Sequence, residues 1–272
     1  MKETNLREAI IRYQPAVTSE SSGQAAFQTF ASAECGASAM STGIVTLGCG
    51  GVLPYHRHTF SEAVTILQGK AQFEVEGRRY LLRPFDCVHV PTGFPHEASN
   101  ASPDRNLVAL WAFASPVPTR ELVDAKFAVE VRSDPRPGDP ENILRFGKAS
   151  KYELADGTEF LDLFAGRFGA VGICGGYGRF GPGSSLPCHI HEYDESITII
   201  EGEAVCEVAG KRHHLKAYDT AFVPTGRPHR FLNESSGPMA MVWVYAGSEP
   251  ARTIVDVGRC TGRAEGERGN NN

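Results

Sequence analysis

The sequence predicts an all-β fold of two tandem barrels with few short helices. Three observations lead to this prediction. The 272-residue chain contains an internal repeat at an offset of 133 residues, about half its length. Segments such as 71–76 and 204–208 alternate apolar and polar residues with the period of two that is typical of strands. The 29 glycines and 17 prolines suit a turn-rich β protein better than a helical one.

The repeat runs without a gap from Gly50 to Asn100 and is matched from Gly183 to Asn233. A match of this length indicates duplication of a whole domain rather than a short solenoid unit. Residues 133–140 contain three prolines and one glycine, which disfavour regular structure and mark the linker. We therefore assign the chain to four parts, which are a first barrel (20–125), a linker (126–148), a second barrel (149–250) and a tail that we expect to be disordered (251–272).

Two short helices are expected in addition to the strands. Residues 119–127 have the pattern of a short helix with Thr119 as its N-cap and with Leu122 and Val123 facing inward. A second helix is expected at residues 5–13.

Composition and charge narrow the function classes. The formal net charge is −5 and the sequence pI is near 6.0, so no basic excess indicates binding to nucleic acid or to a membrane surface. No apolar run approaches the length of a membrane span, and residues 1–13 lack the apolar core of a secretory signal. The cysteines are odd in number and form no Cys-x-x-Cys pair, so we expect reduced thiols and a cytoplasmic location. The seven are Cys35, Cys49, Cys87, Cys174, Cys188, Cys206 and Cys260.

Histidine and glutamate residues recur at fixed spacing in each half. Side chains two apart share one face of a strand, so His56 and His58 point the same way, and Glu62 has the same parity. His96 lies 34 residues after Glu62, where a returning barrel wall would supply a fourth ligand. The second half repeats the set as His189, His191, Glu195 and His229.

This residue set points to a metal site. Imidazole and carboxylate together suit Mn, Fe, Co, Ni, Cu or Zn, and six of the nine histidines occupy these positions. A lone His-x-His on a strand is usually a surface or packing pair, but two full motifs recur here with identical spacing. We expect one divalent metal ion per barrel, with Fe or Mn favoured and Zn, Ni, Cu and Co as alternatives. The surviving alternative is a duplicated fold that binds metal in only one half.

Each half resembles the cupin signature. The segments Gly50–Gly69 and Gly183–Gly202 match its first motif, and Pro91–Asn100 and Pro224–Asn233 match most of its second. The resemblance implies two cupin (jelly-roll-type) β-barrels in tandem, with the eight residues above as metal ligands. It does not specify a reaction, because cupins include dioxygenases, decarboxylases, isomerases, aminohydrolases and metal-free binding proteins.

One position departs from that signature. Phe85 and Tyr218 stand where its second motif begins with glycine, which affects a turn rather than a ligand.

Several further residues are weighed as site candidates. Glu62 and Glu195 are candidate catalytic groups in addition to being ligands. Arg179, with Tyr177 near it, could bind a substrate carboxylate, although a surface arginine is the commoner case. The histidines outside the motifs, His89, His213 and His214, are expected to pack or to be solvated.

Three function hypotheses remain. The favoured one is a bicupin dioxygenase that acts on a small organic substrate, with the metal as Lewis acid and oxygen template. The alternative is a non-oxidative metalloenzyme, such as a decarboxylase, isomerase or aminohydrolase, acting on a small acid or sugar acid. The third is a non-catalytic binding or storage module, against which the complete ligand sets argue. We expect a monomer or a homodimer with a small-molecule substrate, and only one of the two sites need turn it over.

Overall fold

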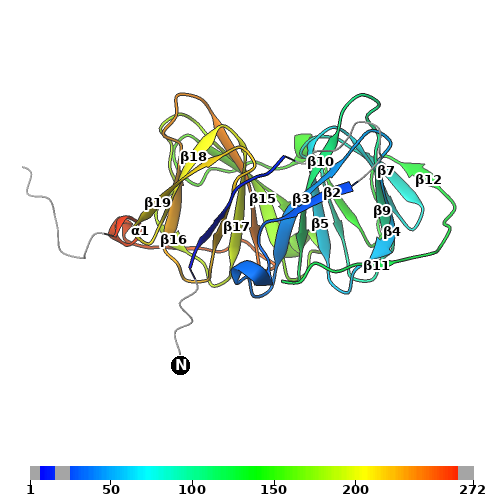
Figure 1. Cartoon of the computed structure of the whole chain (residues 1–272), viewed down its shortest axis with the longest axis horizontal. Coiled ribbons are helices and arrows are strands. Elements are labelled where there is room, and N and C mark those ends of the chain that lie inside the picture. The colour runs from blue at the N-terminus through cyan, green and yellow to red at the C-terminus, as the bar shows by residue number, and fades with distance from the viewer. Residues whose placement is uncertain (1–6, 16–24, 263–272) are drawn as a thin grey trace, which may run out of the picture.

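The computed structural model describes residues 7–15 and 25–262, and Figure 1 shows two β-barrels side by side. The regular elements of the described chain are almost all strands, with one α-helix and three short 3-10 helices, so the all-β prediction of two tandem barrels is confirmed. Each barrel is made of two sheets, as expected for a jelly-roll-type fold.

The first barrel is built from two six-stranded sheets. One has the order β13-β8-β5-β10-β3-β2, and its strands are Asn142–Leu144, Cys87–Val90, Glu62–Gln68, Leu107–Phe113, Ser41–Leu47 and Ala25–Thr29. The other has the order β11-β4-β9-β6-β7-β12, and its strands are Glu121–Leu122, Val52–Arg57, His96–Asn100, Ala71–Val75, Arg78–Leu82 and Glu130–Arg132.

The second barrel repeats this plan with a six-stranded and a five-stranded sheet. The larger has the order β1-β20-β17-β22-β15-β14, and its strands are Ala9–Ile11, Thr220–Val223, Glu195–Glu201, Met239–Tyr245, Cys174–Phe180 and Thr158–Phe164. The smaller has the order β19-β18-β21-β16-β23, and its strands are Lys211–Lys216, Glu203–Val208, His229–Leu232, His189–Ile190 and Thr253–Ile254. The helices are η1 (Ala33–Cys35), η2 (Phe146–Lys148), η3 (Gly166–Phe168) and α1 (Val257–Thr261).

The barrels exchange their first strands. Strand β1 pairs with β20 of the second barrel, whereas β13, the equivalent strand of the second repeat, pairs with β8 of the first. Each exchanged strand is fastened by an aspartate: Asp219 accepts hydrogen bonds from Arg12 and the Tyr13 backbone. Asp86 accepts the matching pair from Arg145 and Phe146. The region 126–148 thus contributes β12 and β13 to the first barrel, and the Pro-rich residues 133–140 contain no strand.

The expected helices are absent from the described residues. In place of a helix at 119–127, β11 pairs with β4 and leaves Leu122 exposed. In place of a helix at 5–13, β1 completes the edge of a sheet, and residues 5 and 6 lie outside the described residues. Sheet pairing satisfies backbone groups that a short isolated helix would leave open to water, so tertiary context overrides the local pattern.

The tail also differs from its prediction over residues 251–262. These residues form β23 and α1, and the remaining tail residues, 263–272, lie outside the described part. Cys260 on α1 forms a disulfide with Cys188, which corrects the expectation that all the cysteines are reduced. The sequence did not reveal this pair because the two residues are 72 positions apart and meet only after α1 docks. The bond also removes the basis on which the cysteines predicted a reducing compartment. No helix among the described residues is long and apolar enough to span a membrane.

Apolar side chains form three cores. One fills each barrel, and the third lies between the sheet that contains β3 and β10 and the sheet that contains β14 and β22. There, Ile44 and Leu110 of the first barrel belong to the same cluster as Leu161 and Val242 of the second. The polar contact between Thr42 and Ser196, with 2.8 Å between their hydroxyl oxygens, crosses the same interface. These two sheets are therefore buried on both faces.

Phe85 and Tyr218, which replace glycine of the cupin signature, keep the backbone conformation that favours glycine. Phe85 has φ 68° and Tyr218 has φ 70°, in the left-handed region that non-glycine residues avoid. Their rings pack on aromatic residues that follow the exchanged strands in the chain. The ring centroids are 5.1 Å apart for Phe85 and Phe146 and 5.0 Å apart for Tyr218 and Tyr13. Aromatic packing offsets the backbone cost and ties each turn to the other repeat.

Candidate metal centres

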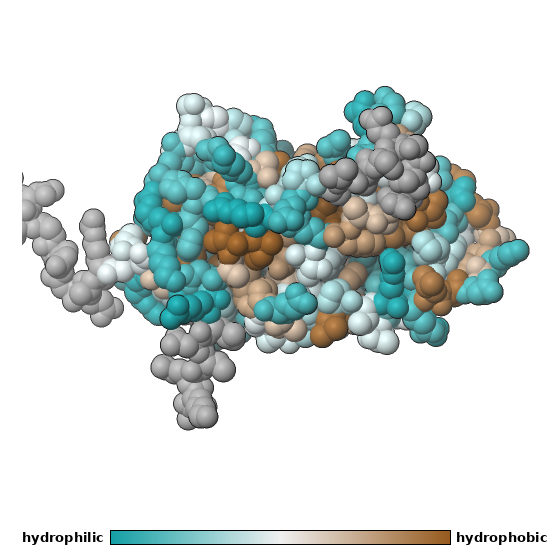
Figure 2. Space-filling view, in the orientation of Figure 1, coloured by the Kyte–Doolittle hydropathy of each residue, from teal (hydrophilic) through white to brown (hydrophobic). Residues whose placement is uncertain are grey.

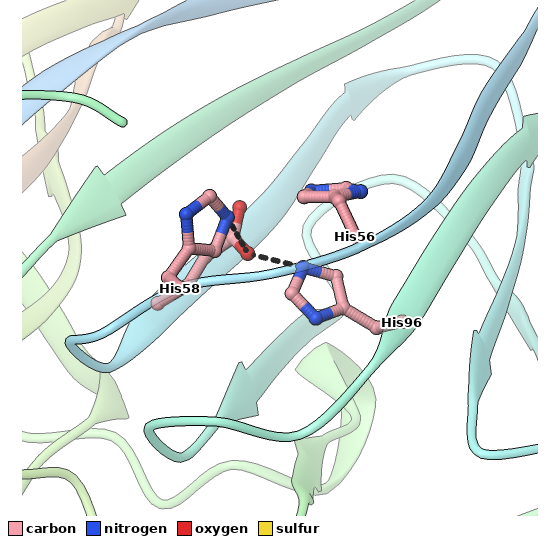
Figure 3. A group of neighbouring side chains, drawn as sticks. His56, His58 and His96 are labelled. Carbon is pink, nitrogen blue, oxygen red and sulfur yellow. Dashed lines mark ion pairs between the residues drawn. The ribbon is translucent and has the colours of Figure 1, made fainter. Parts of the chain in front are cut away.

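The first ligand group lies inside the first barrel. His56 is on β4, His58 follows the end of that strand, and Glu62 and His96 begin β5 and β9. All four side chains are buried, and their ligand atoms lie within 4.8 Å of one another. Figure 3 shows the three imidazoles around the carboxylate, with Nε2 of His96 2.7 Å and Nε2 of His58 3.3 Å from Oε2 of Glu62.

The second group repeats this geometry closely. His189 begins β16, His191 follows it, and Glu195 and His229 begin β17 and β21. Nε2 of His229 lies 2.6 Å and Nε2 of His191 lies 3.3 Å from Oε2 of Glu195. The ring centroids of the first and third histidines are 4.3 Å apart in both barrels. The structure thus brings together all eight predicted ligands as two buried His/Glu metal-binding sites.

The protonation pattern of the imidazoles suits a metal. Each Nδ1 lies within hydrogen-bond distance of a main-chain carbonyl: Pro54, Thr119 and Phe94 in the first barrel and Pro187, Ala251 and Arg227 in the second. A carbonyl can only accept, so the proton is assigned to Nδ1 and the lone pair of Nε2 points inward. Nε2 of His58, His96, His191 and His229 has no hydrogen-bond partner among the described residues. Orphaned inward lone pairs are what a divalent cation requires.

The electrostatics favour an ionised carboxylate and a neutral first histidine in each centre. Burial lowers the pKa of His56 to about 4 and the pKa of His189 to about 3. Burial by itself would raise the pKa of Glu62, but the His96 and His58 imidazoles outweigh it and hold that pKa well below its ordinary value. Glu195 shows the same balance, with His229 and His191 lowering its pKa. Both centres therefore offer an ionised carboxylate and a neutral first histidine at neutral pH.

A cavity of about 290 Å³ opens beside the first centre. We call it the first chamber. Its wall is apolar, with Leu47, Phe73, Trp111 and Phe113 among its members. The mouth includes Phe27 of β2, whose ring lies 5.2 Å from the Arg120 guanidinium. Figure 2 shows hydrophobic residues gathered on this side of the first barrel, near β2 and β3.

The second chamber is smaller and more polar. Its volume is about 210 Å³, and its wall includes Tyr152, Asp162 and Arg252. The Tyr152 hydroxyl donates to Asp162 at 2.6 Å, and Arg167 forms an ion pair with the same carboxylate.

Two pairs of equivalent residues differ between the chambers. Phe231 and Met241 project into the second chamber where the first has Ala98 and Ala109.

The two candidate substrate residues lie away from these walls. Tyr177 packs against Phe85 and Phe146 in the cluster between the barrels, with centroid distances of 5.5 and 5.1 Å. Arg179, two residues along the same face of β15, is exposed. The inward positions of β15 include Gly176 and Gly178, between Cys174 and Phe180 of the barrel core. A Cβ on Gly176 would lie 2.4 Å from the Trp243 ring. His89 is buried in β8, and its Nε2 has no hydrogen-bond partner among the described residues.

Sequence reasoning missed the segments that complete the sites. Residues 118–120 and 250–252 cross the chambers, and their carbonyls at Thr119 and Ala251 hold Nδ1 of His58 and His191 at 2.5 and 2.6 Å. These contacts come from the main chain and carry no residue signature. One signal was available, because Pro-Thr-Arg at 118–120 recurs as Pro-Ala-Arg at 250–252.

Comparisons with known proteins agree with this geometry. The family model described as the Cupin domain matches residues 43–113 and again residues 176–245, together more than half of the chain. A curated relative, quercetin 2,3-dioxygenase of Bacillus subtilis (strain 168), is 28% identical over 114 residues, which are 42% of this chain and 31% of that protein. The chain therefore matches about a third of the length of this relative.

Solved structures of oxalate decarboxylases share the fold. The Bacillus subtilis enzyme at pH 4.6 has a TM-score of 0.68 and 15% identity, over 84% of this chain and 74% of that one. The Lactobacillus farciminis enzyme in a formate complex has a TM-score of 0.70 and 16% identity, over 84% and 83%. A structure concerned with the Mn(II) centres of the Bacillus subtilis enzyme has a TM-score of 0.68 and 14% identity, over 84% and 74%. The duplicated match and the two ligand groups show that the chain belongs to the cupin family and is a bicupin with one metal-binding site in each barrel.

Proposed function

We propose that this bicupin is a metal-dependent enzyme whose first barrel acts on a small organic molecule with an apolar body and a metal-chelating polar end. We further propose that the reaction is oxygen-dependent, as in a dioxygenase. The observation that carries the proposal is the apolar first chamber, whose wall includes the ligand group. The quercetin dioxygenase relative supports it, although that match covers only part of either chain.

The chamber selects for an apolar body. Apart from the metal ligands, Arg120 is the one charged residue in the described lining, and its guanidinium lies over Phe27 at the mouth. A small dianion would find no buried cation beyond the metal, and burying a charge without a partner is costly. An apolar body instead gains about 25 cal/mol for each Å² that it buries. The Trp111 indole N–H is buried without a hydrogen-bond partner in the described residues and can donate to a substrate oxygen.

The residues of the first barrel would hold the metal and exclude water from it. Three histidines and Glu62 hold the metal, with Fe or Mn favoured; Mn is supported by the Mn(II) centres named for the Bacillus subtilis structural neighbour. A bound metal would supply Lewis acidity and redox capacity beside the substrate. Phe113 and Phe60 pack against the His58 ring, at centroid distances of 4.6 and 5.2 Å, and keep water from that side. Glu62 is a candidate base as well as a ligand.

A second function is favoured for the second barrel by its polar wall. Arg252 and the Tyr152–Asp162 pair line a smaller chamber, which suits non-oxidative conversion of a small acid. The oxalate decarboxylase structures share the fold at 14–16% identity and support this second candidate only through that likeness.

Two substrates with opposite properties separate the candidates. Protein loaded with Fe²⁺ or Mn²⁺ is given quercetin or oxalate, in air and without oxygen, and oxygen uptake, quercetin absorbance and formate release are followed. We expect quercetin to be consumed only in air, and the His58→Ala variant to lose this activity while His191→Ala keeps it. Formate release from oxalate in both atmospheres, with no oxygen uptake, would overturn the oxygenase proposal in favour of the second candidate.

A further inference from the structure

The C-terminal segment, residues 250–262, lies across the second barrel. Its strand β23 pairs with β16, which carries the ligand His189, in the register His189 to Ile254. The Val255 backbone N–H donates to the Cys188 carbonyl at 2.9 Å, so the pairing continues past the strand. The segment is thereby an extra edge strand on the strand that holds the metal.

This segment also forms part of the metal site. The Ala251 carbonyl lies 2.6 Å from Nδ1 of His191 and accepts the Tyr193 hydroxyl at the same distance. Pro250, Ala251 and Arg252 line the second chamber. Moving the segment would remove the partner that fixes the His191 tautomer and would open the chamber wall.

The Cys188–Cys260 disulfide is the covalent anchor of this segment. Ile254 and Val257 are 55% and 49% exposed, so they bury little apolar surface. Cys260 is fully buried, and its carbonyl accepts the Gly210 N–H at 2.8 Å. The other cystine partner, Cys188, immediately precedes the ligand His189.

The first barrel has the same crossing segment without the covalent bond. The Thr119 carbonyl lies 2.5 Å from Nδ1 of His58, and the Val123 N–H donates to the Tyr55 carbonyl at 2.9 Å. Tyr55 occupies the position of Cys188, and its ring packs on Phe127 at a centroid distance of 5.1 Å. That segment continues into β12, which pairs with β7 and holds its far end. The first barrel therefore provides a disulfide-free control for the second within the same chain.

We propose that the Cys188–Cys260 disulfide is a positioning element of the second metal centre. It holds the Ala251 carbonyl against His191, so that breaking the bond loosens the metal in the second barrel and leaves the first barrel unaffected. In reduction by a dithiol, the S–S bond breaks and two electrons and two protons pass to the two cysteines. The dithiol becomes a cyclic disulfide. Retention of the second metal thus depends on the redox state of this pair.

Metal release from one centre at a time tests the proposal. The His58→Ala variant keeps only the second centre and the His191→Ala variant only the first. Each is loaded with Zn²⁺ and mixed with a chromogenic chelator, before and after treatment with a water-soluble phosphine, and broken disulfides are counted by thiol labelling. Loss of a partner that orients a ligand typically costs about 10-fold to 100-fold in metal affinity. We expect release from the second centre to accelerate at least about tenfold on reduction, and release from the first to stay unchanged.

A cysteine variant provides the control for reductant access. Adding Cys260→Ser to His58→Ala should give fast release without phosphine and no further response to it, with an unchanged far-ultraviolet circular dichroism spectrum. Equal release rates with the disulfide intact and broken would overturn the proposal, as would equal acceleration in both barrels. Should the phosphine fail to reach the buried bond, slow release from the Cys260→Ser variant would overturn it. Metal release involves no turnover, so this outcome is independent of the proposed reaction.

Discussion

At the scale of single residues, the two barrels differ most in the side chains that fill their chambers. In the first barrel Phe73 faces Ala98 across neighbouring strands, and in the second Cys206 faces Phe231. Along the next wall Ala109 is replaced by Met241. The metal ligands are repeated while the space beside them is not, which supports the proposal that the first barrel takes the bulkier substrate.

Filling the first chamber tests that assignment. We expect Ala109→Met to lower turnover of an apolar substrate such as quercetin at least about tenfold. The added side chain would occupy space that the bound substrate needs, and overpacking of this kind costs about 1–3 kcal/mol. Metal content, measured by elemental analysis, should stay at the wild-type level. The matched control is Met241→Ala, which enlarges the second chamber and should leave first-barrel turnover unchanged. Full activity of a metal-loaded Ala109→Met variant would contradict the assignment.

His89 is expected to make stability sensitive to acid. Burial lowers the pKa of His89 to about 4, with only a partial opposing effect from Glu62, whereas the unfolded pKa is near 6.5. The unfolded chain therefore binds a proton that the folded chain refuses, and stability is lost as pH falls from about 6.5 to about 4. This loss amounts to about 3 kcal/mol. Above pH 6.5 the contribution is complete.

The second repeat supplies the replacement for this test, because Phe222 occupies the equivalent position and is fully buried. The difference in unfolding free energy between His89→Phe and wild type, measured by urea denaturation, should change by about 3 kcal/mol in favour of the variant from pH 7 to pH 4. A difference that does not vary with pH would show that His89 is not the acid-sensitive group.

The ligands could be predicted from sequence, and the substrate residues could not. The eight ligands recur at one offset, and strand alternation places the two histidines of each His-x-His pair on one face of the sheet. The sequence therefore determines the ligand set. Tyr177 and Arg179 were candidates because of their chemistry, but they share the face of β15 that is turned away from the chamber. The inward face of that strand has Gly176 at its centre, which allows the Trp243 ring to lie against the backbone. The direction of a strand's faces depends on register, which one sequence does not fix.

At the scale of elements, the strands repeat between the barrels, whereas residues 119–127 and 251–262 differ from their predictions. Thr119, Leu122 and Val123 have the spacing of a capped helix, yet the chain is extended there and β11 pairs with β4. The open edge of β4 provides more backbone hydrogen bonds than a single isolated turn could. In the same way, pairing with β16 makes part of the tail that was expected to be disordered into strand β23.

The two exchanged strands allow a matched comparison of ion pairs. Arg145 is 16% exposed and bonds to Asp86 and Asp134 at 2.8 Å, whereas Arg12 is 59% exposed and bonds to Asp219. We expect Arg145→Ala to cost about 3 kcal/mol of unfolding free energy, because it leaves the buried Asp86 without its cation. Arg12→Ala should cost about 1 kcal/mol or less, because solvent around the exposed Arg12 guanidinium screens its contact with Asp219, although Asp219 is as buried as Asp86. Urea denaturation measures both, and equal losses would show that burial does not set the strength of these contacts.

At the scale of the whole molecule, the barrels are joined by more than a linker. The repeat extends to the exchanged strands, since Glu8 and Arg12 precede Glu141 and Arg145 by the same 133 positions. The offset was visible in the sequence, but which barrel each strand joins is decided by tertiary packing. A common apolar cluster and two exchanged strands make each barrel depend on the other.

Such an arrangement predicts unfolding as one unit. Differential scanning calorimetry of metal-free protein should give a single transition whose calorimetric and van't Hoff enthalpies agree. Tyr177→Ala, which removes a ring from the interface between the barrels, should lower the transition temperature without splitting it. Two resolved transitions in the wild-type protein would mean that the barrels fold independently.

The most direct test of the account is the number of metal ions held by one chain. Elemental analysis, combined with native mass spectrometry, counts the ions in the wild-type protein and in the His58→Ala and His191→Ala variants. Two equivalent buried ligand groups predict two ions in the wild type and one in each variant. A wild-type chain that holds one ion, or a variant that still holds two, would contradict the existence of two complete centres.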